Sequence, residues 1–519
     1  MMDRSSSTNL KVPTALSRRF LLPLAVVWLA CGSSADRVEE RANTVTIAFD
    51  GPGTMALHPN WSESPQWLVF LPLVDVDENG EWVGRLAESW EASPDWSAWT
   101  FHLRPDLRWQ DGVPVTAHDV EFTLRLAMHP EVADLPADYF DSIEVVDDHT
   151  LIIRSNYFTT GHPILVTVYY PRHLLEGLDP AEIAGWEFWT HPVGNGPYRV
   201  VRYLPETMME FEVNPDYFGT RPRIERLVLK FTGGAAQIDL LAEQVDAAMI
   251  LEPMDLPRFI ADPRFRVHFE ILDALAVGIY WNTEHPSLRD ARVRRALTMA
   301  IDRGSLLAAL NLPADLPLVD GPYTPRQIRR DELPEPLPFD RDMAASLLEE
   351  AGWRDIDGDG IREKGGEELR ISVVTRVYSQ DHAILVQSDL KRVGVRLDLE
   401  LVETAVTLSR LRAGDFEALI TLFEVHPATN VQRVFGTGGW TQYSNPRLDE
   451  LLAQAVSAGD PAVIDELYAE IYDLFRDEQP ATFLFPSIRP WVVHRRLQGL
   501  SAPWVADPIV YLDRLWLEE

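Results

Sequence analysis

Residues that could carry chemistry are scattered along this chain, and their spacing favours ligand binding over catalysis. The stretch Asp355-Ile-Asp-Gly-Asp-Gly360 begins like a calcium-binding loop, but Gly366 occupies the twelfth position, where a bidentate Glu is required. We therefore expect a hairpin turn there, with a calcium site as the alternative. The sequence contains no H-E-x-x-H or G-x-S-x-G motif. We expect no enzyme activity, no resident metal and no cofactor.

The single cysteine, Cys31, ends the short apolar run 20–30, and the pair Arg18-Arg19 precedes that run. A charged start followed by a short apolar stretch is typical of a signal peptide, and the run is too short to span a bilayer. A cysteine at this point resembles a bacterial lipobox, in which the thiol is acylated. We expect residues 1–31 to be a lipoprotein signal peptide and 32–43 a flexible linker. Plain secretion and a retained membrane anchor are the alternatives.

Composition narrows the class of protein. The chain has 519 residues, of which 46% are hydrophobic, so it can bury a large core. Its net charge of −33 argues against nucleic acid as a partner, because binding nucleic acid requires clustered basic residues. One cysteine excludes an intramolecular disulfide. We expect a monomer that is soluble apart from its N-terminal lipid.

Strand and helix patterns alternate and predict an α/β fold. Trp99–Arg104 reads as a half-buried strand, and Thr116 with Asp119 forms a capping-box start to a helix. Residues 369–401 read as strand, helix and strand, a βαβ pattern. We further expect one helix over 290–310 and a long surface excursion over 311–338. Strands at 274–283, 481–485 and 491–494 suggest that the chain crosses twice between two lobes, as in a hinge.

Several motifs occur in order along the chain. They are Leu86–Glu91, Thr100–Leu124, Pro192-Val-Gly-Asn-Gly-Pro-Tyr198, Asn214–Tyr217, Asp290–Ala296, Ala300–Arg303, Ala345–Trp353, Gly394-Val395, Gly414–Phe416 and Tyr443–Asp449. With these motifs the sequence resembles the family 5 extracytoplasmic solute-binding proteins, the dipeptide-, oligopeptide- and nickel-binding group that serves ABC importers. The resemblance runs from about Thr44 to the C-terminus.

This resemblance implies the α/β, two-lobed fold of periplasmic binding proteins, of type II and cluster C-like. An extra subdomain in the first lobe and a hinged cleft between the lobes are expected. The implied boundaries are 44–273 for lobe I, with the subdomain at roughly 60–190, 274–480 for lobe II, and 481–519 for a return to lobe I.

The resemblance also implies where a ligand binds. Peptide-binding relatives pair the ligand's ammonium group with an Asp that follows a Trp, and the matching stretch here offers Glu424 or His426 instead. Arg376 and Tyr378 follow a strand end, where α/β folds place ligand contacts, and Arg376 could bind a carboxylate through two hydrogen bonds. Aromatic residues that could line the cleft, or equally pack in the core, are Tyr280, Trp281, Trp440 and Tyr139.

The function expected from these features is capture of a small ligand, most simply a short peptide, for delivery to the permease subunits of an ABC importer. The protein would work in the periplasm or at the cell surface, held to the membrane by its lipid. One alternative keeps the same role with another cargo, such as a nickel chelate, a haem or an oligosaccharide. Another is a surface lipoprotein that senses or adheres without feeding a transporter.

Overall fold

The computed structural model describes residues 43–49, 65–76, 82–129, 132, 140–155, 168–232, 234–250, 255–323, 334–376, 379–424, 428–458, 460–500 and 515–518. The chain separates into two units, Met1–Ala42 and Asn43–Glu519. The predicted signal peptide, with Cys31, therefore lies outside the described residues. Within them, no helix combines the length and apolar character that crossing a membrane would require.

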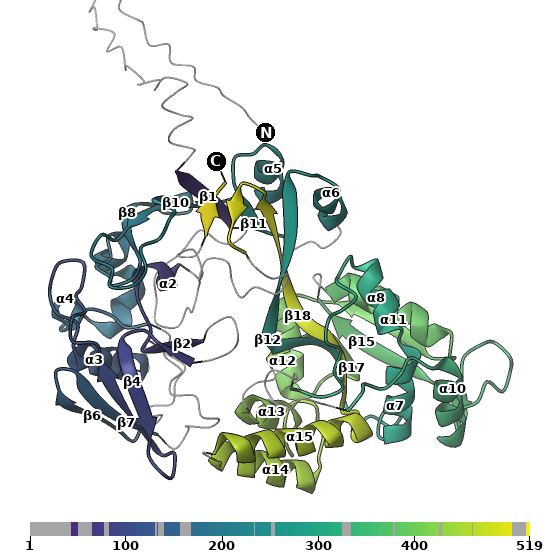
Figure 1. Cartoon of the computed structure of the whole chain (residues 1–519). Coiled ribbons are helices and arrows are strands. Elements are labelled where there is room, and N and C mark those ends of the chain that lie inside the picture. Colours follow the sequence, from purple (N-terminus) through teal and green to yellow (C-terminus); the bar gives the residue numbers. More distant parts are fainter. Residues whose placement is uncertain are drawn as a thin grey trace, which may run out of the picture. The chain divides into compact units, whose positions relative to one another are not determined.

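The largest sheet has ten strands in the order β16-β15-β17-β12-β18-β11-β1-β10-β9-β8 (Figure 1). These strands are β1 (Thr44–Phe49), β8 (Tyr198–Leu204), β9 (Met208–Val213), β10 (Arg226–Phe231), β11 (Ala247–Met249), β12 (Phe265–Trp281), β15 (Arg370–Thr375), β16 (Arg396–Leu401), β17 (Ala418–Glu424) and β18 (Ala481–His494). The two predicted C-terminal strands are therefore a single strand, β18.

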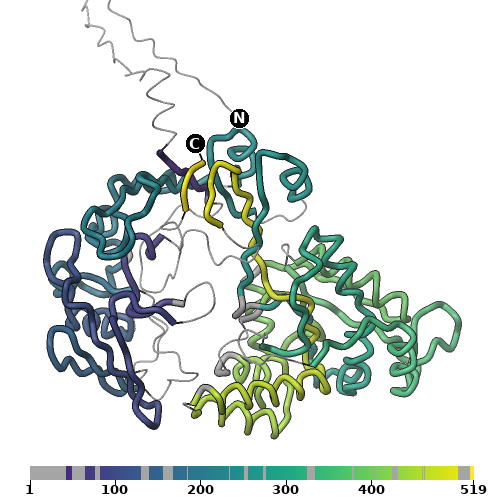
Figure 2. Tube along the Cα trace, viewed as in Figure 1, coloured from purple at the N-terminus to yellow at the C-terminus, as the bar shows by residue number. Residues whose placement is uncertain are grey.

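Strands β12 and β18 are neighbours near the middle of this sheet and pair antiparallel along their lengths. Figure 2 traces them side by side, β12 in teal and β18 in yellow. The C-terminal part of β12, from Leu275 onward, pairs with β17. The C-terminal part of β18, at 491–493, pairs with β11. The register shifts between Leu272 and Ala276, so that extra residues of β12 face none on β18. Such a bulge bends the strand that contains it, and it falls where the sequence placed the change between lobes.

A second sheet of four strands has the order β4-β5-β7-β6. It comprises β4 (Ala87–Ala92), β5 (Ala98–Leu103), β6 (Ser142–Asp147) and β7 (Thr150–Arg154). Helix α3 (Ala117–Ala127) lies between β5 and β6 in the sequence. The capping box of α3 is confirmed, because the Thr116 amide donates to the Asp119 carboxylate at 2.8 Å. The other oxygen of Asp119 accepts from the Arg172 amide at 2.9 Å. This buried carboxylate therefore fastens a distant segment to the helix start.

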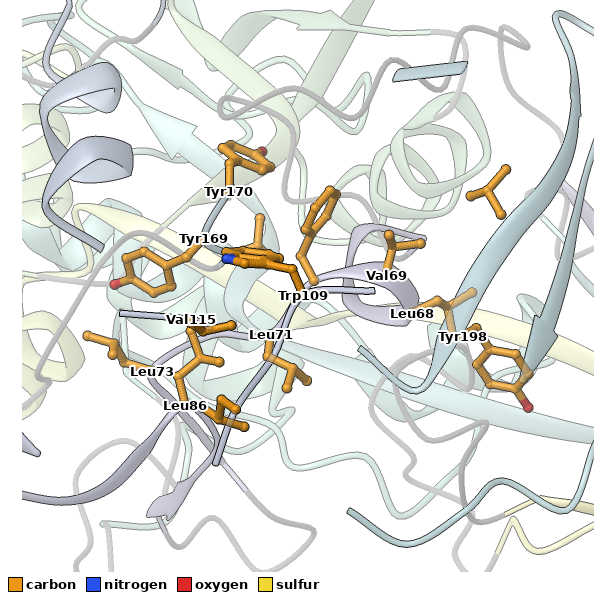
Figure 3. Close-up of a cluster of buried hydrophobic side chains, with 14 of the residues drawn as sticks. Leu68, Val69, Leu71, Leu73, Leu86, Trp109, Val115, Tyr169, Tyr170 and Tyr198 are labelled. Carbon is orange, nitrogen blue, oxygen red and sulfur yellow. The ribbon is translucent and has the colours of Figure 1, made fainter. Parts of the chain in front are cut away.

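The motif at 192–198 binds the end of helix α2 (Gln66–Val69) through backbone hydrogen bonds, and we call this contact the latch. The amides of Asn195 and Gly196 both donate to the Val69 carbonyl, at the end of that helix. A Cβ atom on Gly194 would lie only 1.9 Å from that carbonyl oxygen, so no other residue fits there. The latch sits beside a core of large side chains, drawn in Figure 3, that includes Trp109 and Tyr170.

Two expectations about 290–338 are wrong. The predicted single helix divides into α7 (Ala291–Ala300) and α8 (Arg303–Ala309), because Asp302 leaves helical geometry and caps α8 through the Ser305 amide at 2.9 Å. The following segment is not a surface excursion in its described part. Its buried residues include Leu312, Leu316, Val319, Asp320, Tyr323 and Leu337.

The C-terminal half confirms the βαβ pattern, because β15 and β16 run parallel and helix α11 (Gln380–Lys391) connects them. Further helices are α10 (Arg341–Glu350), α12 (Thr404–Ala413), α13 (Ala428–Phe435), α14 (Pro446–Ser457) and α15 (Pro461–Glu478). Shorter elements are β2 (Val74–Val76), β3 (Trp82–Gly84), α4 (Arg172–Leu175), η1 (Pro180–Gly185), η2 (Glu187–Thr190), α5 (Ala236–Leu241), α6 (Leu256–Ile260), β13 (Glu363–Lys364), β14 (Glu367–Glu368), β19 (Leu497–Gln498) and β20 (Trp516–Leu517).

Candidate ligand-binding pocket

A cavity of about 170 Å³ lies near the carboxyl ends of β15 and β17. These strands run parallel, with Thr375 opposite Ile420, so their carboxyl ends meet at one edge of the sheet. Open α/β sheets bind ligands at this edge. The residues lining the cavity are Arg376, Thr407, Leu408, Leu411, Thr421, Leu422, Arg433 and Trp440.

Helix α12 supplies one wall of the cavity and β17 another. Leu411 and Thr407 of the helix are 1% and 2% exposed, and Thr421 of the strand is 4% exposed, so this part of the wall is fixed by packing. The hydroxyl of Thr407 donates at 3.3 Å to the carbonyl of Glu403, the residue that caps the start of α12. Helix α12 ends at Gly414, which adopts a left-handed conformation with φ of 66°. Leu408, Leu411 and Leu422 outnumber the two threonines, so this wall is more aliphatic than polar.

Two arginines give the cavity its charge. Arg376 directly follows the last residue of β15 and is partly buried. Arg433, on α13, is exposed, and its guanidinium carbon lies 5.0 Å from the centre of the Trp440 ring. A cation over an indole face is attracted by the ring, which limits where the guanidinium goes. None of the described residues lining the cavity is Asp or Glu.

The structure brings together two of the residues that the sequence nominated, Arg376 and Trp440. It separates Tyr280 and Trp281 from them. Both are 0% exposed: Tyr280 stacks on Phe435 with ring centres 5.7 Å apart, and the Trp281 indole donates to the Thr482 hydroxyl at 3.1 Å. Of the two alternatives given for these residues, lining the cleft or packing in the core, the described structure has both rings packed in the core.

The remaining nominated residues cannot be placed as side chains. Glu424 is the last residue of β17 and its backbone pairs with Leu275, but its side chain lies outside what the structure describes. His426, Tyr378 and Tyr139 fall outside the described residues altogether.

Sequence reasoning missed Arg433 and the walls of the cavity. Arg433 meets Trp440 because the chain reverses through Gly436, Gly438 and Gly439, and the Trp440 amide donates back to the Arg433 carbonyl at 3.2 Å. The glycines indicate a turn, but nothing local in the sequence says that this turn closes beside β17.

The predicted turn at 355–360 is confirmed. The carboxylates of Asp355, Asp357, Asp359 and Glu363 lie within 4.8 Å of one another and are mostly exposed. Each accepts backbone amides of its own loop, as when Asp355 binds the Gly358 amide at 2.8 Å. The loop leads into the hairpin β13–β14. These contacts account for the acidic residues as turn formers.

A larger hollow of about 1060 Å³ lies near the start of β15 and has a mixed lining. Lys364 and Arg370 share it with Glu367, Glu368 and Asp398, and Arg370 pairs with Asp398. Its charges have no common sign, and it lies away from the carboxyl ends of the strands. The arginine cavity is therefore the better candidate site.

This chain is similar to known proteins along most of its length. Residues 81–435 match the family described as bacterial extracellular solute-binding proteins, family 5. The oligopeptide-binding protein AppA of Bacillus subtilis is 24% identical over 476 residues, which cover 87% of this chain and 86% of AppA. The solved structure of that AppA with a nonapeptide has a TM-score of 0.69 at 22% identity, covering 92% of this chain and 99% of AppA.

A second solved structure is NikZ from Campylobacter jejuni in complex with Ni(L-His). It has a TM-score of 0.72 at 22% identity and covers 91% of this chain and 99% of NikZ. At this identity the likeness to solved structures establishes the fold. The predicted two-lobed α/β fold of periplasmic binding proteins is thereby confirmed.

Proposed function

Since this chain belongs to the bacterial extracellular solute-binding proteins of family 5, we propose that its solute is a short peptide. The observation that carries the proposal is the cavity at the carboxyl ends of β15 and β17, with Arg376 at its edge. A free peptide presents a carboxylate, which a guanidinium can bind through two parallel hydrogen bonds. The relative AppA is named for oligopeptides, which supports the same cargo.

The other end of a peptide is an ammonium group, which needs an acidic partner once it leaves water. We assign this role to Glu424, which ends β17 two residues after the cavity-lining Leu422; His426 is the second choice. Charged hydrogen bonds contribute roughly 1.5–3 kcal/mol each. A micromolar dissociation constant needs about 8 kcal/mol, so the two ends together with buried apolar area are sufficient.

Delivery and anchoring complete the proposal. We propose that lobes I (44–273) and II (274–480) close around the peptide, and that residues 481–519 return to lobe I. The register shift between Leu272 and Ala276 supports a pivot at this boundary. The loaded monomer would then dock on the permease subunits of an ABC importer. Acylation at Cys31 would hold it to the outer face of a membrane.

A metal chelate is the second candidate cargo. The likeness to NikZ in complex with Ni(L-His) favours it, with a TM-score of 0.72. Histidine in such a complex also carries a carboxylate, so Arg376 would serve either cargo. The two candidates differ in the mass of what the protein retains.

Native mass spectrometry of residues 32–519, purified from cells grown in rich medium, tests the proposal. A ladder of added masses that match short peptides supports it. A single defined mass with a nickel isotope pattern would transfer the assignment to a chelate.

Matched variants then test the site. Arg376→Gln should weaken binding of an eluted peptide by about 10- to 100-fold, the loss expected for one charged hydrogen-bond pair. Arg412→Gln is the control, because Arg412 is an exposed arginine of the neighbouring α12 that does not line the cavity. Equal affinity of both variants would remove Arg376 from the site.

A further inference from the structure

We propose that the edge of the large sheet at which β1 begins lies against anionic phospholipid, with Arg223, Arg266 and Arg495 binding the lipid phosphates. This inference rests on the part of the proposed function that places an acyl anchor at Cys31. It goes beyond anchoring, because it states which surface of the protein meets the membrane and through which residues.

Several strand ends meet at this edge. β1 runs parallel to β10 and to β11, with Thr44 opposite Arg226. β18 runs antiparallel to both β11 and β12, with His494 opposite Phe265. The starts of β1, β10 and β12 therefore lie at the same edge as the end of β18. Figure 1 shows β1, β10 and β11 together in this part of the sheet.

The proposed anchor is close to this edge along the chain. Only residues 32–43 separate Cys31 from Thr44, and twelve residues span at most about 40 Å. The Thr44 carbonyl accepts from the Arg496 guanidinium at 2.9 Å, and Arg496 pairs with Asp246 at 2.6 Å, so the start of β1 is held to the edge. An acyl group on the cysteine would therefore keep this edge within about 40 Å of the membrane.

Arg266 and Arg495 place two positive charges close together at the edge. Exposed Arg495 donates to the Pro263 carbonyl at 2.6 Å, and Arg266 of β12 donates to the Leu497 carbonyl at 2.6 Å. Neither forms an ion pair with a carboxylate among the residues that the structure describes. Burial lowers the pKa of Arg266, and the nearby charge of Arg495 lowers it further, against an opposing effect of Glu518. An anion beside both guanidinium groups would relieve their repulsion.

Arg223 and Trp516 extend this basic surface. The guanidinium carbon of exposed Arg223 lies 5.0 Å from the centre of the Trp516 ring, and no described carboxylate pairs with it. Trp516 is partly buried and lies opposite Gln498 of β19, next to the Leu497 whose carbonyl accepts from Arg266. Tryptophan is enriched where a membrane meets water, because its ring is apolar and its N–H is polar. The pairing of arginine with an indole suits the headgroup region.

The edge differs in charge from the chain as a whole. A net charge of −33 should keep most of the protein away from an anionic membrane. Charges are screened beyond about 8 Å at physiological ionic strength, so the membrane responds mainly to the groups that face it. Glu518 accepts from Gln498, and the described ion pairs here are Arg221–Glu225, Arg264–Asp262, Arg264–Glu243 and Arg496–Asp246. The three arginines outside these pairs leave a small positive excess.

The single cysteine allows a test that does not depend on acylation in cells. Residues 31–519 are coupled through Cys31 to a maleimide lipid, in vesicles of phosphatidylcholine alone or mixed equally with phosphatidylglycerol. Hydrogen exchange of the backbone amides in 494–500 and 515–518 is followed by mass spectrometry. We expect slower exchange on the anionic vesicles at 0.1 M salt. The difference should vanish at 1 M salt, where the screening length falls from about 10 Å to about 3 Å.

Matched variants identify the residues responsible. Each arginine near an anionic membrane should contribute about fivefold, equivalent to about 1 kcal/mol. Arg223→Gln combined with Arg495→Gln should therefore lower the ratio of membrane-bound to free edge by about 25-fold, so that exchange is the same on both kinds of vesicle. The control, Arg354→Gln with Arg412→Gln, removes the same charge from exposed arginines on other elements and should keep the protection. Since all four side chains are exposed, the fold should persist, which circular dichroism verifies.

Each other outcome contradicts the proposal. Equal exchange of the unchanged protein on both kinds of vesicle overturns it, and so does protection that survives 1 M salt or the Arg223 and Arg495 variant. Protection that appears only when the vesicles carry the importer's permease subunits would assign this edge to the transporter instead. Because the coupling is chemical, a negative result says nothing against acylation at Cys31. The mass of the N-terminal peptide from the native protein tests acylation separately, and neither result bears on the cargo.

Discussion

The guanidinium of Arg303 donates to the carboxylate of Asp320 at 2.8 Å, and the two side chains are 5% and 0% exposed. Arg303 also donates to the carbonyls of Val319 and Leu337. The Leu337 amide in turn donates to the second oxygen of Asp320. This buried pair therefore joins the two described parts of the segment, 311–323 and 334–338, to each other and to the start of α8.

Replacing one partner of this pair should be costly. Asp320→Ala leaves a buried guanidinium without its counter-charge, so we expect the free energy of unfolding to fall by about 3–5 kcal/mol. Urea denaturation measures this directly. The exposed Asp315 of the same segment is the control, and Asp315→Ala should change stability by less than about 0.5 kcal/mol. If Asp320→Ala is as stable as the control, the pair does not support the fold. Adding Arg303→Met to Asp320→Ala should restore part of the loss.

Glycine at 194 is required by contact with a backbone carbonyl. A Cβ there would meet the Val69 oxygen at 1.9 Å, and the carbonyl is already held by two amides. Gly194→Ala should therefore lower the free energy of unfolding by about 1–3 kcal/mol, the range for overpacking. It should also lower the thermal midpoint of unfolding. In Gly185→Ala the added Cβ would meet no described atom within 4 Å. A thermal scan in which both variants melt together would contradict the latch.

His382 should make the protein less stable in acid. Burial lowers the pKa of His382 to about 4, against opposing contributions from Asp381 and the Ser379 backbone. Its unfolded value is about 6.5, so between pH 6.5 and pH 4 the unfolded chain binds more protons and stability falls as pH falls. The loss levels off below pH 4 at about 3–4 kcal/mol.

Thermal midpoints from pH 7 to pH 4 check this effect. His382→Leu should flatten the acid side of the profile, whereas His102→Leu, on the exposed side of β5, should keep its shape. A His382→Leu profile parallel to that of the unchanged protein would refute the assignment.

Salt should stabilise this protein. Its net charge of −33 makes the folded state repel itself. Raising ionic strength from 0.1 M to 1 M shortens the screening length from about 10 Å to about 3 Å. We expect the thermal midpoint to rise over this range, and to rise equally in NaCl and KCl, since screening depends on ionic strength. A midpoint that stays level or falls would mean that local ion pairs, such as Arg496 with Asp246, outweigh the repulsion.

The elements that were predicted correctly from the sequence are those set by residues close together in the chain. The alternation of Trp99, Phe101 and Leu103 specified β5, and Thr116 with Asp119 specified the start of α3, because each depends on near neighbours only. The cap at Asp302 is also local, because it uses the Ser305 amide three residues later, whereas the burial of Asp320 depends on Arg303 and Leu337, each 17 residues away. The site divides in the same way. Arg376 follows a recognisable strand end, so its place near the cavity could be expected. Arg433 reaches the cavity because the chain turns back beside β17, and no local feature of the sequence predicts that contact. Tyr280 is buried whereas Trp440 lines the cavity, and only tertiary packing distinguishes the two.

The pairing of β12 with β18 also has a consequence for the order in which the chain can fold. Thr482 lies 201 residues after its partner Trp281, and β11 and β12 both bond to β18. As the polypeptide is made from its N-terminus, these two strands keep exposed, unpaired edges until residues 481–494 emerge. Such edges invite wrong partners. Chain completion, rather than any local step, therefore closes the central sheet, and a fragment that stops before residue 481 should be prone to aggregate.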